Sequence, residues 1–93
     1  MISVKITENG ICMNGHAGRN VNGKDLACAA ISALTCNLIN SLQELTDIKI
    51  RAETESGKTV IEWEELTEPA KLLVDSWFLG IVGVNQEYNC IEF

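Results

Sequence analysis

Two residues near the start of the chain have the types and surroundings needed for nucleophilic catalysis. His16 is the only histidine, and a stretch rich in glycine and asparagine follows it up to residue 24. Cys28 comes twelve positions after His16, at the expected start of a helix. A thiolate can attack a carbonyl carbon, and an imidazole can return and withdraw the protons that amide hydrolysis requires. The pattern makes Cys28 a candidate nucleophile and His16 a candidate base.

The expected helix start would favour the reactive form of the Cys28 thiol. Asp25 is a good N-cap residue, and residues 26–42 contain neither glycine nor proline. With Asp25 as the cap, Cys28 is the third helical residue, where backbone N–H groups are unpaired and the helix dipole favours a thiolate. Free amides there and in the Gly15–Gly18 loop could also stabilise the oxyanion of a tetrahedral intermediate.

Each of these residues also has a simpler explanation. A cysteine among alanines commonly packs in a core, and a histidine beside glycine commonly serves a turn. Capping alone explains Asp25, and a hydrogen bond back into the helix explains Ser32. Arg19 and Lys24 are explained as solvated loop charges, although they could bind a substrate backbone or carboxylate. Residue types and spacing therefore leave three functions open: a nucleophilic enzyme, a non-catalytic anion-binding loop and an acidic interaction module.

The other three cysteines, Cys12, Cys36 and Cys90, are expected to be small buried hydrophobic residues. Disulfides are not expected, because the chain shows no secretion signal and cytosolic thiols stay reduced. A zinc site is not expected either, because no C-x-x-C pair is present. We therefore expect no metal or other cofactor.

The elements that must position the candidate residues follow the order ββαββαβ. Alternating apolar residues predict strands over residues 2–8 and 11–15, around Ile48 and Ile50, and from residue 59, with Asn9-Gly10 and Ser56-Gly57 as turns. A last strand is expected at residues 88–93, and helices are expected after Asp25 and from about Pro69. We predict a single α+β domain over residues 1–93, an antiparallel-rich sheet packed with two helices on one or both faces.

Each predicted helix has apolar residues expected to face the sheet. In the first helix these are Ala27, Ala30, Ile31, Leu34, Leu38 and Leu42. In the second helix they are Leu72, Leu73, Phe78 and Leu79.

The charge distribution restricts the partners of the chain. The net charge is −6, and residues 44–93 carry 11 acidic against 4 basic side chains. Such a chain has no basic surface for nucleic acid, whereas its acidic half could attract a basic partner. No apolar stretch is expected to reach the roughly 18 residues of a membrane span. A soluble, cytoplasmic protein is therefore predicted.

One segment resembles the signature of a known family. GHAG at residues 15–18, glycine at 23, aspartate at 25 and CAAIS at 28–32 are similar to the motif of the ribosomal-processing cysteine proteases, the Prp family. The likeness extends to the chain length and the order of elements. Ala27 departs from the pattern, because a larger aliphatic residue is usual there, and this difference should alter packing alone.

The resemblance implies roles for particular residues and a substrate. It implies that Cys28 is the nucleophile, that His16 is the base, and that Gly15, Asp25 and Ser32 support them. It also implies a homodimeric endopeptidase that removes the N-terminal extension of large-subunit ribosomal protein twenty-seven, cutting after a phenylalanine. Some relatives act on phage structural proteins, which leaves a second class of substrate open.

Overall fold

The computed structural model describes residues 1–16 and 24–93, and for Lys24 and Asp25 it describes the backbone alone. The elements follow the predicted order ββαββαβ. They are β1 (Ile2–Thr7), β2 (Gly10–Asn14), α1 (Lys24–Leu45), β3 (Ile50–Glu55), β4 (Lys58–Trp63), α2 (Glu68–Tyr88) and β5 (Ile91–Glu92).

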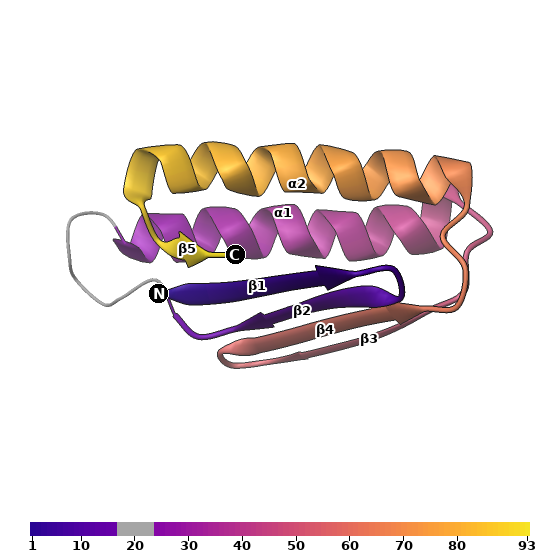
Figure 1. Ribbon diagram of the computed structural model, residues 1–93, viewed down its shortest axis with the longest axis horizontal. Helices are drawn as coiled ribbons and strands as arrows, with labels where there is room; N and C mark the ends of the chain where they lie inside the picture. The colour runs from indigo at the N-terminus through magenta and orange to yellow at the C-terminus, as the bar shows by residue number, and fades with distance from the viewer. Residues whose placement is uncertain (17–23) are drawn as a thin grey trace.

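The five strands form one mixed sheet in the order β3-β4-β2-β1-β5. Three neighbouring pairs are antiparallel, and β5 runs parallel to β1 at the opposite edge from β3. Both helices cover the same face of this sheet (Figure 1). The predicted α+β class with an antiparallel-rich sheet is confirmed, and the helices lie on one face rather than on both.

Alternation along the strands determines which side chains face the helices. On β1, Ile2 and Val4 are buried at 5% and 4% exposure, and Val4 pairs with Met13 of β2. Ile6, at the far end of the same strand, is 41% exposed. The helices therefore cover the beginning of β1 more completely than its end.

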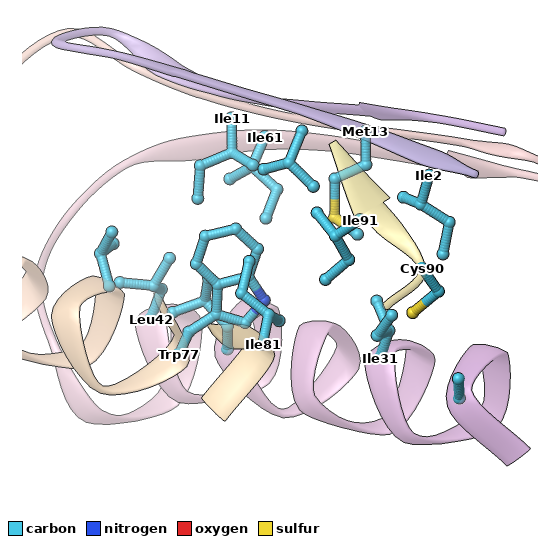
Figure 2. Close-up of a cluster of buried hydrophobic side chains, with 14 of the residues drawn as sticks. Ile2, Ile11, Met13, Ile31, Leu42, Ile61, Trp77, Ile81, Cys90 and Ile91 are labelled. Atoms are coloured by element: carbon cyan, nitrogen blue, oxygen red, sulfur yellow. The ribbon is translucent and has the colours of Figure 1, made fainter. Parts of the chain in front are cut away.

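The core lies between the sheet and the helices. Figure 2 shows strand side chains such as Ile11 and Ile61 pointing towards Leu42 of α1 and Trp77 of α2. Ile61 and Leu42 are completely buried. Such complete burial contributes about 1.5–3 kcal/mol per side chain relative to exposure.

The prediction for the buried face of α2 was wrong. Leu72 and Leu79 are 71% and 73% exposed, Phe78 is 37% exposed, and only Leu73 packs against the core. The reason is the rotation of α2 about its axis, which turns the large Trp77 ring inward, where its Nε1 donates a hydrogen bond to Thr35 of α1. The buried residues of the helix are Ala70, Val74, Trp77 and Ile81.

The predicted buried face of α1 is largely correct, with Ala27, Ile31, Leu38 and Leu42 at 0%, 3%, 2% and 0% exposure. The expectation about membrane spans was wrong in one respect. By length and composition alone, the segment Leu26–Leu45 is apolar enough to cross a membrane, with a mean hydropathy of 1.3. In this fold its apolar face packs against the sheet and α2, as the central helix of a folded domain does.

Candidate active site

His16 and Cys28 line one pocket, although twelve positions separate them in the chain. The pocket has a volume of about 280 Å³ and lies between α1 and the β3–β4 hairpin. Ile2 and Met13 of the sheet also contribute to its lining. A pocket of this kind can hold a short segment of a polypeptide beside a thiol and an imidazole.

Cys28 is partly buried and faces the pocket from the beginning of α1. It is therefore neither enclosed in the core nor freely exposed, and a carbonyl group in the pocket can reach it. The preceding residue, Ala27, is completely buried. Its packing fixes the rotation of α1 about its axis, and this rotation determines the direction in which the Cys28 side chain points.

The predicted cap at Asp25 is wrong in position. Helix α1 begins at Lys24, so Asp25 lies within the first turn and Cys28 is the fifth helical residue. Because the unpaired amides of a helix belong to its first turn, those amides precede Cys28 along the chain. An oxyanion in the pocket would have to approach them from that side, and the N–H of Cys28 itself is not one of them.

His16 is exposed at the rim of the pocket, and the surrounding backbone holds it in place. The N–H of Gly15 donates a hydrogen bond to the carbonyl oxygen of Gly57 at 2.8 Å. The nitrogen of Met1 donates another to the carbonyl oxygen of His16 at 2.7 Å. Gly15 has a φ of +103°, and a Cβ there would lie 2.5 Å from the carbonyl oxygen of Met1, so glycine is needed at this turn.

The remaining candidate residues are placed as follows. Ser32 is exposed and lines the pocket one helical turn after Cys28. Arg19 lies outside the described residues, and so do the side chains of Lys24 and Asp25. The sequence-based roles of these three in substrate binding and support therefore stay predictions.

Sequence reasoning missed the second wall of the pocket. The β3–β4 hairpin contributes residues 54–59, including the charged side chains of Glu55 and Lys58. On α1 the lining continues through Thr35, Cys36 and Ile39. The helical part could have been found, because positions 28, 32, 35 and 39 recur at the spacing of one helix face. The hairpin could not, because only folding brings it beside α1.

The four cysteines, all within the described part, have different surroundings, and no disulfide joins them. Cys90 is buried as expected, at 1% exposure. Cys36 is exposed, so its prediction was wrong, and Cys12 is intermediate on the β2 strand. Across residues 1–16 and 24–93, no group of three His, Cys, Asp or Glu side chains is placed to hold a metal ion.

A thiol and the chain's only imidazole at one peptide-sized pocket are the components of a cysteine hydrolase. Comparison with known proteins agrees with this class. The family model of the cysteine protease Prp matches residues 1–91. The chain belongs to this family, and it is a cysteine peptidase.

Relatives with known names and structures are similar along nearly the whole chain. The ribosomal processing cysteine protease Prp of Staphylococcus aureus is 28% identical, over 96% of this chain and 92% of that protein. A crystal structure of that protease with a covalently linked product peptide has a TM-score of 0.88 at 25% identity, covering 99% and 96% of the two chains. A protein from Streptococcus mutans has a TM-score of 0.83 at 27% identity, covering 99% and 90%.

Proposed function

We propose that this cysteine peptidase is an endopeptidase in which Cys28 is the nucleophile and His16 the general acid and base. The observation that carries the proposal is that the partly buried Cys28 thiol and the exposed His16 imidazole line the same pocket. The covalently linked product peptide in the Staphylococcus aureus protease supports a mechanism with a covalent intermediate.

The proposed reaction proceeds in two halves. The Cys28 Sγ thiolate attacks the carbonyl carbon of the scissile bond, and His16 donates a proton to the departing amine as the C–N bond breaks. This leaves an acyl group on Cys28. His16 then removes a proton from water, and the hydroxide attacks the thioester and releases the new carboxyl end while the thiolate is restored.

We propose that the substrate is the N-terminal extension of large-subunit ribosomal protein twenty-seven. The relatives named as ribosomal processing proteases support a ribosomal substrate. The acidic second half of the chain supports a basic partner, as ribosomal proteins are, because opposite charges steer association. A cytoplasmic location is part of this proposal, since ribosomal proteins are made there.

The test compares two variants of the full chain, each with one cysteine replaced by alanine. Wild type, Cys28→Ala and Cys36→Ala are incubated with a precursor peptide and with a phage scaffold peptide, and the products are read by mass. Cys36 lines the same pocket but is exposed, which makes it a matched control. We expect cleavage of the ribosomal peptide by wild type and Cys36→Ala and none by Cys28→Ala. Cleavage by Cys28→Ala would contradict the assignment, and cleavage of the phage peptide alone would contradict the substrate.

Alkylation supplies a readout that needs no substrate. We expect iodoacetamide to label Cys28 faster than the other three cysteines near neutral pH, and His16→Ala to slow that labelling, because an imidazolium beside a thiolate stabilises it. Equal, slow labelling of all four thiols would count against the catalytic pair.

We also propose that the protein is a homodimer. Leu72 and Leu79 lie two turns apart on one face of α2, and both are largely exposed. Large exposed apolar side chains on one face of a helix favour association. Light scattering after gel filtration should give the mass of two chains for wild type and of one chain for the Leu72→Lys, Leu79→Lys double variant. A monomeric wild type would contradict the proposal.

A further inference from the structure

The imidazole of His16 lies directly against a glycine of the β3–β4 turn. A Cβ built on Gly57 would lie 2.7 Å from Nε2, 3.2 Å from Cε1 and 3.5 Å from Cδ2 of His16. The edge of the ring farthest from the backbone therefore occupies the space that any side chain at position 57 would need. This contact joins residues that are 41 positions apart in the sequence.

Gly57 also holds the backbone that precedes His16. Its carbonyl oxygen accepts the hydrogen bond from the N–H of Gly15 at 2.8 Å. One residue of the hairpin thus contacts both the imidazole and the chain from which the imidazole extends. A displacement of the turn would therefore act on the imidazole and on the backbone beside it together.

We propose that Gly57 is a positioning residue that sets the place of the His16 imidazole in the pocket. The proposal rests on the function proposed above, in which His16 transfers the protons. A Cβ at position 57 would have to push the ring back by about 0.7 Å to turn the 2.7 Å approach into an ordinary 3.4 Å contact. Because a displacement of about 1 Å in a catalytic group can cost about a hundredfold in rate, we expect a loss of roughly tenfold to a hundredfold in kcat.

The competing explanation is that Gly57 serves the turn alone. Its φ of +77° lies in the left-handed region, where glycine is favoured. Asparagine tolerates this region better than other residues with a side chain, yet it still carries a Cβ. Gly57→Asn therefore keeps most of the turn geometry and introduces the collision with the ring. If the glycine serves only the turn, Gly57→Asn retains activity.

The experiment measures kcat and KM on the precursor peptide, and the pH profile of Cys28 alkylation, for wild type, Gly57→Asn, Gly57→Ala and His16→Ala. Gly83→Ala is the matched control, because a Cβ there meets nothing within 4 Å. We expect both Gly57 variants to lose kcat with KM changed by less than about twofold, and their alkylation profiles to approach that of His16→Ala. Gly83→Ala should behave as wild type. A folded Gly57→Asn with the kcat and alkylation profile of wild type overturns the proposal.

A second measurement keeps the result independent of catalysis. The chain has one histidine, so its ring protons give unambiguous NMR signals. We expect a nuclear Overhauser effect between the His16 ring and the Gly57 Hα protons in wild type, and shifted ring signals in Gly57→Asn. If His16→Ala changes neither cleavage nor alkylation, the proposed function fails. The NMR signals of the His16 ring in wild type still show whether the ring contacts Gly57. Absence of the Overhauser effect overturns the positioning role even when the enzyme is active.

Discussion

Thr35 connects the two helices at the centre of the core, and its replacement gives a quantitative test of the packing. The side chain is 4% exposed. Its hydroxyl donates to the carbonyl oxygen of Ile31 at 2.7 Å and accepts from Nε1 of Trp77 at 3.1 Å. Thr35→Val keeps the shape but removes the acceptor, so the buried indole N–H of Trp77 is left without its partner.

The cost follows from the burial of that N–H group. Leaving a buried donor unsatisfied costs about 1–3 kcal/mol of the free energy of unfolding. At about 4–8 °C per kcal/mol for a domain of this size, the Tm of Thr35→Val should fall by roughly 4–24 °C. Because the hydroxyl is committed to Ile31 and Trp77, peptide cleavage measured well below the Tm should remain close to that of wild type, although Thr35 lines the pocket.

The assay is urea unfolding and thermal unfolding, both followed by circular dichroism and applied to a double-mutant cycle with Trp77→Phe. The phenylalanine side chain has no N–H group. In that background, Thr35→Val removes a hydroxyl acceptor to which residue 77 no longer donates. We expect Thr35→Val to lower the free energy of unfolding less in the Trp77→Phe background than in wild type, by about 1 kcal/mol or more. This difference is the coupling energy between Thr35 and Trp77. Equal costs in the two backgrounds, or an undiminished Tm in Thr35→Val, would refute the reasoning.

Two further predictions concern α2 and the strand that follows it. Gly83→Ala should raise stability by about 1 kcal/mol, because alanine favours a helix and its Cβ meets nothing within 4 Å. Gly80→Ala should gain less or lose stability, because its Cβ would lie 3.1 Å from Leu34 of α1; paired thermal melts compare the two. Asn85→Ala should speed amide exchange at Cys90 and Ile91 and cost about 1–3 kcal/mol, because Oδ1 of Asn85 accepts from both amides. Asn85→Asp keeps an acceptor and should exchange more slowly than Asn85→Ala, and equal exchange in the two variants would contradict the role of that oxygen.

The order of the elements could be predicted because it depends on patterns between near neighbours. Apolar alternation with Asn9-Gly10 and Ser56-Gly57 turns predicts both hairpins, and the structure contains them as β1–β2 and β3–β4. The short spacing between His16 and Cys28, with its glycines, likewise identified the segment that carries the two candidate residues. The helix start was missed by two residues, because capping preferences do not define a boundary that closely.

Long-range contacts could not be predicted from such patterns. The rotation of α2 depends on how Trp77 meets Thr35, a pair 42 positions apart, and the many apolar residues around that helix made several faces possible. The order β3-β4-β2-β1-β5 is likewise a choice among pairings that the same strands would allow.

The same reason separates the two halves of the candidate site. A local sequence motif identifies Cys28 and His16 as the candidate residues, because the type of a side chain and its place in a helix determine which chemistry is open to it. The pocket around them depends on the β3–β4 hairpin, whose Gly57 lies beside His16 because β4 pairs with β2. A short segment of chain therefore carries both candidate catalytic residues, whereas sheet pairing between distant segments supplies the surface against which the imidazole lies.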